Sequence, residues 1–152
     1  KNCQKLIIST GVSSSTDLLS VNNLYDSLNS SKLPNLTFLH CISEYPISDI
    51  SNYNFSNIPY IKKITSKEVG YSDHSLGPLA PSYAVALGAN VIEKHFTIDN
   101  DLYGADHSMS ANPNVFKEMV KMCNDVKVMM GSRRLNKYYE CESGSVQFCS
   151  ED

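Results

Sequence analysis

Short apolar runs alternate with stretches of helical periodicity along this chain, and a polar loop follows each run. The runs lie at residues 5–10, 36–41, 69–72 and 91–96, and each has the length and composition of a buried strand. Apolar residues at helical spacing follow three of the runs, and a stretch of small residues follows the third. The pattern therefore predicts four consecutive strand–helix units, which pair as a parallel sheet with right-handed crossovers.

Capping signals place the ends of the predicted helices. We expect Ser15 to be the N-cap of the first helix and Pro59 to lie near the start of the second. Asn112 and Pro113 form a cap and first-position pair for the fourth helix, which Gly131 closes. The apolar residues of this fourth helix form a stripe that we expect to face the core: Val115, Met119, Met122, Val126 and Met129.

Two architectures contain consecutive units of this kind, a doubly wound sheet and a (β/α)8 barrel. Neither a G-x-G-x-x-G pattern nor a P-loop follows the first run, which weakens the case for a nucleotide-binding sheet. Polar residues gather instead after every run, and a barrel builds its active site at the carboxyl ends of its strands. We therefore predict an α/β fold over residues 1–131, a partial TIM barrel of four βα units, because a full barrel needs about 250 residues. Residues 132–152 are expected to be a linker or a truncated tail.

Composition narrows the classes of partner. The chain has 152 residues and a formal net charge of −3 with no basic stripe, so we expect no nucleic-acid partner. No apolar run has the length that crosses a bilayer, so we expect no membrane partner. Five cysteines without a C-x-x-C pair, in a chain without a signal-peptide pattern, favour reduced thiols and a cytoplasmic location. Because the chain begins at Lys1 rather than at a methionine, we expect it to be a fragment.

Three ionisable residues, Glu93, Lys94 and His95, interrupt the fourth apolar run. Charged side chains are rarely buried unless they are paired or liganded. The triplet therefore indicates either a catalytic or binding role, or an internal Glu93–Lys94 ion pair beside a histidine without a function. By the two-residue period of a strand, Glu93 and His95 lie on one side and Lys94 on the other. Glu93 is then expected to orient His95, and Lys94 to extend its ammonium group to solvent.

Histidines end two consecutive predicted strands, at His74 and at His95. The carboxyl ends of neighbouring parallel strands lie about 5 Å apart, so these imidazoles are expected to converge on a metal or a substrate. Asp106, on the loop after the fourth strand, either binds a sugar hydroxyl or is a solvated loop acid. At the second strand end Tyr45 either contacts substrate or packs, and one of the pair His40 and Cys41 is expected only to fill space.

Five segments in order resemble the N-acetylneuraminate (sialic acid) synthase family, whose relatives make legionaminic and pseudaminic acids. One such motif is weak evidence, whereas five in sequence at plausible spacings are strong evidence. The resemblance covers the first 131 residues and corresponds to the C-terminal half of that family's barrel. The segments are Ser9-Thr-Gly11, His40-Cys-Ile-Ser-Glu-Tyr-Pro46, Gly70-Tyr-Ser-Asp-His-Ser-Leu-Gly77, Val91-Ile-Glu-Lys-His-Phe-Thr97 and Gly104-Ala-Asp-His107.

The resemblance implies a reaction and a metal. Members of the family condense phosphoenolpyruvate with an open-chain N-acetylhexosamine such as N-acetylmannosamine, giving a nine-carbon 2-keto sugar acid and phosphate. A divalent metal, typically Mn²⁺ with Mg²⁺ or Co²⁺ as alternatives, binds the sugar aldehyde oxygen as a Lewis acid. In this sequence His74 and His95 match the metal ligands, and Ser9 and Ser72 match contacts to phosphoenolpyruvate.

The remaining matches concern the amino sugar and the catalytic carboxylates. Tyr45 and Asp106 match contacts to the sugar, and Ser43 lies where some members carry an asparagine. We expect Glu93 and Asp106 to be the carboxylates that take part in catalysis. The Gly104-Ala-Asp-His107 form of the last motif is more similar to the sialic and legionaminic branches than to the pseudaminic branch.

The chain also departs from the family pattern. Members carry lysines that bind phosphoenolpyruvate and a general acid/base glutamate in the first half of the barrel, and none of that half is present in this sequence. They are homodimers in which a C-terminal antifreeze-like domain closes the partner's site, and residues 132–152 do not match that domain. The alternatives are therefore a non-catalytic half-barrel that retains metal or ligand binding, and a different metal-dependent aldolase-like barrel.

Overall fold

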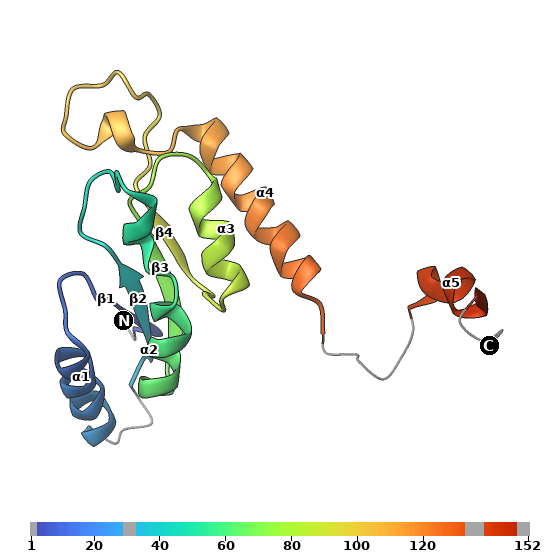
Figure 1. The fold of residues 1–152 in the computed structure, drawn as a ribbon. Coiled ribbons are helices and arrows are strands. Elements are labelled where there is room, and N and C mark those ends of the chain that lie inside the picture. The colour runs from blue at the N-terminus through green and yellow to red at the C-terminus, as the bar shows by residue number, and fades with distance from the viewer. Residues whose placement is uncertain (1–2, 29–32, 133–138, 149–152) are drawn as a thin grey trace.

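Four parallel strands form one curved sheet in the order β1-β2-β3-β4 (Figure 1). The computed structural model describes residues 3–28, 33–132 and 139–148. The strands are β1 (Lys5–Ser9), β2 (Asn35–Cys41), β3 (Glu68–Asp73) and β4 (Ile92–Lys94). Each strand pairs in parallel with the next one along the chain, as consecutive strands do in a (β/α)8 barrel. The predicted partial barrel of four strand–helix units is confirmed.

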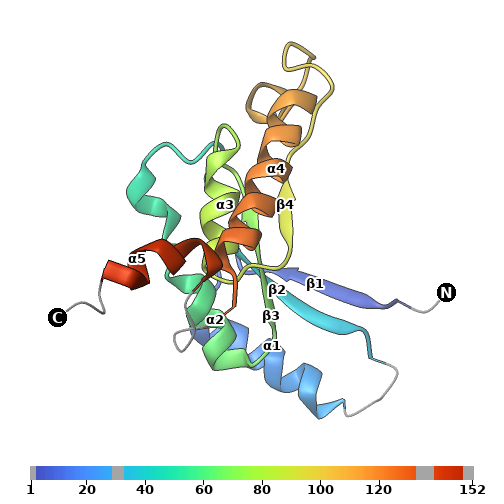
Figure 2. The same ribbon diagram turned by 90° about the vertical axis from the view of Figure 1, so that its right-hand side faces the viewer.

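The first four helices each follow a strand, and they lie along one face of the sheet (Figures 1 and 2). Alternate strand residues pack with these helices in one core, which includes Phe38 and Tyr71. Ser72 and Glu93 belong to the opposite set, on what we call the inner face. The helices are α1 (Ser15–Ser27), α2 (Asn57–Thr65), α3 (Leu79–Ala86), α4 (Pro113–Met130) and, beyond residues 133–138, α5 (Ser143–Phe148), with short 3-10 turns at Ile50–Tyr53, His107–Met109 and Glu140–Glu142.

Two helix starts differ from the prediction by one or two residues. The N-cap of α1 is Ser14 rather than Ser15, because Ser14 and Asp17 form a reciprocal capping box. Helix α2 begins at Asn57, before Pro59, since a proline in the first turn lacks only an N–H that has no partner within the helix. Asn112 caps α4 with Pro113 at its first position, as predicted.

Strand β4 is shorter than the predicted run at 91–96. After Lys94 the backbone no longer pairs with β3 and pairs with Ala111 instead. The N–H of Ala111 donates to the carbonyl of His95 at 2.9 Å, and the N–H of Thr97 donates to the carbonyl of Ala111 at 3.0 Å. His95 therefore lies at the point where the chain leaves β3 and pairs with the segment that precedes α4.

The apolar stripe of α4 is only partly buried. Met119 is 4% exposed, whereas Met129 in the last turn is 74% exposed. Leu24 of α1 is exposed in the same way. Helical spacing predicted which face is apolar, but the area that covers a face depends on neighbouring elements, and the described sheet has only four strands. No helix in the described ranges is long and apolar enough to span a membrane.

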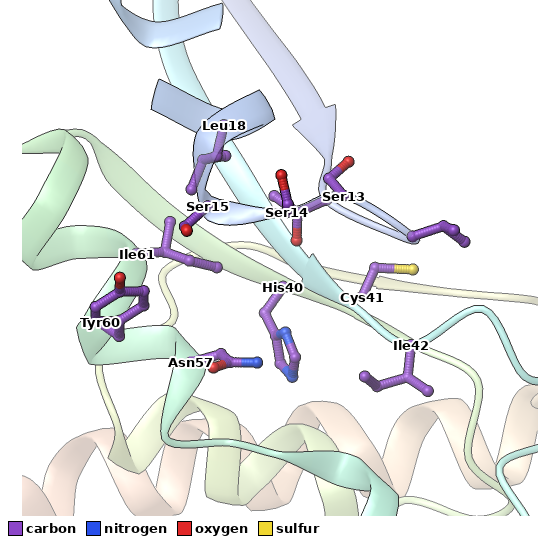
Figure 3. A pocket seen from close by; sticks show the side chains of 12 residues that line it. Ser13, Ser14, Ser15, Leu18, His40, Cys41, Ile42, Asn57, Tyr60 and Ile61 are labelled. Atoms are coloured by element: carbon purple, nitrogen blue, oxygen red, sulfur yellow. The ribbon is translucent and has the colours of Figure 1, made fainter. Parts of the chain in front are cut away.

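His40, at the end of β2, is buried on the helix side of the sheet. Its Nε2 donates to the carbonyl of Tyr53 at 2.7 Å, and its ring stacks on Tyr71. Figure 3 shows His40 beside Asn57 in the wall of a hollow of about 230 Å³ between the starts of α1 and α2. His40 fills space, as expected for one of the pair at this strand end, and Cys41 is also buried.

Burial holds the pKa of His40 below its ordinary value, although the bond to Tyr53 opposes this shift. The unfolded chain therefore binds more protons than the folded chain once the pH falls to about 6.5. We expect the free energy of unfolding to decrease from pH 7.5 to pH 5.5, with a slope from His40 of at most about 1.4 kcal/mol per pH unit.

Urea unfolding at several pH values measures this slope. His40→Phe keeps an aromatic ring against Tyr71 but cannot titrate, so its slope should be shallower than that of the wild type whatever its absolute stability. Equal slopes in the two proteins would contradict the assignment.

Candidate metal and substrate site

The imidazoles of His74 and His95 lie side by side at the carboxyl ends of β3 and β4. Their ring centroids are 5.5 Å apart, and the rings meet edge to face at 76°. Nδ1 of His74 lies 2.7 Å from the carbonyl oxygen of Ile42. Because a carbonyl can only accept, this nitrogen carries a proton, and in the neutral ring the lone pair is on Nε2. The two histidines therefore lie next to each other, while their binding of a common metal or substrate stays a prediction.

His95 contacts a carboxylate on the loop after β4. Its Nδ1 lies 3.6 Å from Oδ2 of Asp106, a distance for an ion-pair contact rather than a hydrogen bond. The side chain of His95 is 32% exposed and that of Asp106 is 65% exposed. The site is therefore open to solvent on the side of Asp106.

Tyr45 forms a wall of the same site. Its ring centroid lies 4.0 Å from that of His74 and 5.9 Å from that of His95. About half of the Tyr45 side chain is exposed, so its ring packs on the histidines and also faces solvent. An exposed aromatic face beside two imidazoles can pack against the carbon skeleton of a small polar ligand.

Ser72 and Glu93 come two residues before His74 and His95 along their strands. The hydroxyl of Ser72 donates a hydrogen bond of 2.7 Å to Oε1 of Glu93. The two residues are partners in the β3–β4 register and lie on the inner face. Glu93 therefore orients Ser72, whereas the carboxylate beside His95 is Asp106. The expectation that Glu93 orients His95 is not what the structure shows.

Ser9 and Ser43 form a separate group at the ends of β1 and β2. The hydroxyl of Ser9 accepts a hydrogen bond of 3.4 Å from the N–H of Gly11. A Cβ atom at Gly11 would lie 2.5 Å from the hydroxyl oxygen of Ser43, so glycine allows these two loops to approach. Ser43 lies two residues before Tyr45 on the loop after β2, so this group is adjacent in sequence to a residue that packs on the histidines.

Lys94 does not extend to solvent, and this correction changes the electrostatics of the site. Its Nζ lies 2.6 Å from Oδ2 of Asp73 and 2.6 Å from the carbonyl oxygen of Ser75. The side chains of Lys94 and Asp73 are 2% and 0% exposed. The alternative of a Glu93–Lys94 ion pair is wrong as well, because these neighbours point to opposite faces of the sheet and Lys94 pairs with Asp73.

Asp73 is enclosed by further donors. Oδ1 accepts from the hydroxyl of Tyr71 at 3.1 Å and from the N–H of Ser75 at 2.9 Å. Burial, followed by the charge of Asp73, raises the pKa of Tyr71 far above its ordinary value. The same two causes raise the pKa of the Cys123 thiol in α4. Asp73 and Lys94 therefore form a buried charged pair in which both carboxylate oxygens and the ammonium nitrogen are hydrogen-bonded, and the sequence did not indicate this pair.

Side-chain hydrogen bonds also order the loop that carries Asp106. Thr97 and Nδ1 of His107 are 2.8 Å apart, and Asn100 donates to the carbonyls of His107 and Ser110 at 2.8 and 2.9 Å. Asn112, the N-cap of α4, donates to the side chain of Asn100 at 3.0 Å. The signal for this loop in the sequence is the density of Thr, Asn and Asp residues, whose side chains bond to nearby backbone in loops.

The histidine pair fits a divalent cation. Imidazoles that bind one ion through bonds of about 2.1 Å have ring centroids about 5 Å apart, close to the separation observed. The bond from Nδ1 of His74 to Ile42 is the kind of outer contact that orients a ligating histidine. Among the residues that the structure describes, no group of three or more His, Cys, Asp or Glu side chains could hold a metal. An ion held by these two imidazoles would take its other ligands from outside the described residues.

Comparisons with known proteins agree on one family. The family model described as the NeuB family matches residues 1–135. The chain is 38% identical over 136 residues to the pseudaminic acid synthase of Campylobacter jejuni, covering 90% of this chain and 38% of that protein. It is 40% identical over 134 residues to the N,N'-diacetyllegionaminic acid synthase of Legionella pneumophila, covering 84% of this chain and 36% of that protein.

A solved structure gives the same result. The N-acetylneuraminic acid (sialic acid) synthetase of Leptospira borgpetersenii, crystallised with citrate, superposes with a TM-score of 0.82 at 30% identity, over 95% of this chain and 49% of that one. The chain thus spans 36 to 38% of the length of these curated relatives. From the match over residues 1–135 and the shared fold, this chain belongs to the NeuB family.

Proposed function

We propose that these residues form the metal-binding half of a synthase that condenses phosphoenolpyruvate with an N-acetylhexosamine. The products are a nine-carbon 2-keto sugar acid and phosphate. The observation that carries the proposal is the pair of adjacent imidazoles, His74 and His95, bordered by Tyr45 and Asp106. The relatives named as pseudaminic and legionaminic acid synthases support this class of reaction.

His74 and His95 are the proposed ligands of a divalent cation, for which we propose Mn²⁺, with Mg²⁺ and Co²⁺ as alternatives. Such a cation supplies Lewis-acid polarisation of the sugar aldehyde oxygen when it is bound. The hydrogen bond from Nδ1 of His74 to Ile42 holds the ring so that Nε2 points its lone pair away from the backbone. His95 is oriented by its contact with Asp106 and by the backbone bond between its carbonyl and Ala111.

The substrates are proposed to bind on either side of this pair. Tyr45 packs against the sugar, and the exposed carboxylate of Asp106 accepts hydrogen bonds from its hydroxyls. Ser9 donates to phosphoenolpyruvate, with Ser43 beside it. Ser72 contacts the same substrate through its hydroxyl oxygen, because its one proton is donated to Glu93.

In the proposed reaction the enol carbon bonds to the aldehyde carbon, water adds to the carbon that bore the phosphate, and the C–O bond to phosphate breaks. Glu93 and Asp106 are the carboxylates proposed to accept and return the protons that this addition moves. Glu93 is held for that role by its bond to Ser72. These assignments place Glu93 on the inner face and Asp106 on the loop that follows β4.

Phosphoenolpyruvate is negatively charged, so its binding site requires cationic side chains. The lysine beside His95 does not point toward that site. Lys94, adjacent to His95, is turned to the helix side and is committed to Asp73 and Ser75. We therefore propose that the remaining phosphate-binding groups come from the rest of a barrel, since this chain spans under two fifths of the length of its relatives. A half-barrel that binds metal without turnover is the second candidate function, and the same observation favours it. Homodimerisation and a cytoplasmic location remain predictions.

Phosphate release from phosphoenolpyruvate, with N-acetylmannosamine and Mn²⁺ present, tests this proposal. We expect the 152 residues alone to release no phosphate above background, because the phosphate-binding cations are missing. We expect a complete barrel that contains them to turn over at about 1 s⁻¹ or faster. A His74→Ala, His95→Ala variant of that barrel should lose activity and Mn²⁺ binding, whereas His40→Phe, which alters a buried histidine on the other side of the sheet, should keep both.

Two results would contradict the account. Turnover by the 152 residues alone at ordinary rates would show that the site is complete within them. Absence of phosphate release by the complete barrel with N-acetylmannosamine and with legionaminic-type precursors would rule out the proposed reaction.

A further inference from the structure

The two proposed metal ligands are each preceded by one member of a buried ion pair. Asp73 comes directly before His74, Lys94 comes directly before His95, and Asp73 and Lys94 are register partners in the β3–β4 ladder. They are also the last pair of that ladder. Beyond it, the backbone at His95 pairs with Ala111 instead of with β3.

The ion pair brackets His74 from both sides. Nζ of Lys94 binds Oδ2 of Asp73 at 2.6 Å and the carbonyl of Ser75 at 2.6 Å, so it holds the residues before and after His74. Oδ1 of Asp73 accepts from the N–H of Ser75 at 2.9 Å, which closes the turn around His74. These bonds lie on the helix side of the sheet, whereas the rings of His74 and His95 pack against each other and against Tyr45. The pair can therefore fix the spacing of the histidines without touching a ligand.

The energetics argue against a simple role in stability. Removing two charges from water is costly, and replacing a buried ion pair by apolar groups of similar volume is often neutral or stabilising. Both side chains are almost fully enclosed, at 2% and 0% exposure. A buried ion pair at the ends of two strands holds those ends at a defined separation, because its hydrogen bonds form at only one geometry.

We propose that the Asp73–Lys94 ion pair is a positioning device that sets the separation of the His74 and His95 imidazoles for binding one divalent cation. Asp73 and Lys94 are positioning residues, and neither contacts the cation or the substrates. The inference rests on the proposed function, because it assigns the histidines to a shared ion.

The test removes both charges together in the full chain, with Asp73→Asn, Lys94→Met. This variant keeps a side-chain oxygen for Tyr71 and Ser75 and a side chain of similar length at 94. The matched control is Asp125→Asn, Lys121→Met, which removes an exposed ion pair of α4 with an N–O distance of 2.5 Å. Lys94→Arg is the conservative variant and should restore the behaviour of the wild type.

Two readouts separate positioning from stability. Nuclear Overhauser effects between the ring protons of His74 and His95, recorded without metal, report the separation of the rings, whose centroids are 5.5 Å apart. Calorimetric titration with Mn²⁺ reports the binding site. We expect the variant at 73 and 94 to lose the inter-ring effects and to bind Mn²⁺ about 10- to 100-fold more weakly, with thermal unfolding within a few degrees of the wild type. The control variant and Lys94→Arg should keep both signals.

Retention of the inter-ring effects, or of Mn²⁺ affinity within twofold, in the variant at 73 and 94 would overturn the proposal. If that variant does not fold, Lys94→Met alone removes both bonds of Nζ and leaves Asp73 its donors Tyr71 and Ser75. Unchanged Mn²⁺ affinity in this single variant would overturn the proposal equally. A wild-type chain that binds no Mn²⁺ would refute the metal assignment of the proposed function, while the inter-ring effects would still decide whether the ion pair positions the rings.

Discussion

The candidate site depends on the alternation of side chains at the ends of two adjacent parallel strands. Successive residues of a strand point to opposite faces, so Asp73 and Lys94 point toward the helices while His74 and His95 point inward. The buried ion pair and the imidazole pair therefore both depend on how the ends of β3 and β4 are aligned. A slip of β4 by one residue against β3 would turn Lys94 to the inner face and His95 into the helix layer, and would separate both pairs.

This construction explains why charged residues are tolerated in a strand that otherwise resembles a buried one. Lys94 is neutralised by Asp73 and also bonded to a backbone carbonyl, so its charge is not left unpaired in the protein interior. Glu93 is partly exposed on the inner face and accepts a hydrogen bond from Ser72. The three consecutive ionisable residues thus have three separate environments, set by strand geometry.

The sequence predicted the parallel sheet, the units and the convergence of the histidines, because these follow from apolar periodicity and from the common direction of parallel strand ends. It did not predict the partner of Lys94. Snorkelling is the usual behaviour of an isolated lysine, and recognising Asp73 as its partner requires the register of β3 against β4. It also placed Glu93 under His95, although side chains on one face can choose a cross-strand partner such as Ser72 over a neighbour in the same strand. The contact between His95 and Asp106 depends on the fold of a long loop, which periodicity does not specify.

The central claim is that His74 and His95 bind the same ion, and pulsed electron paramagnetic resonance of Mn²⁺ added to the chain tests it most directly. The account predicts hyperfine couplings from two histidine nitrogens, reduced to one when either His74 or His95 is replaced by alanine. A spectrum with no nitrogen coupling, or one that neither replacement changes, would contradict it.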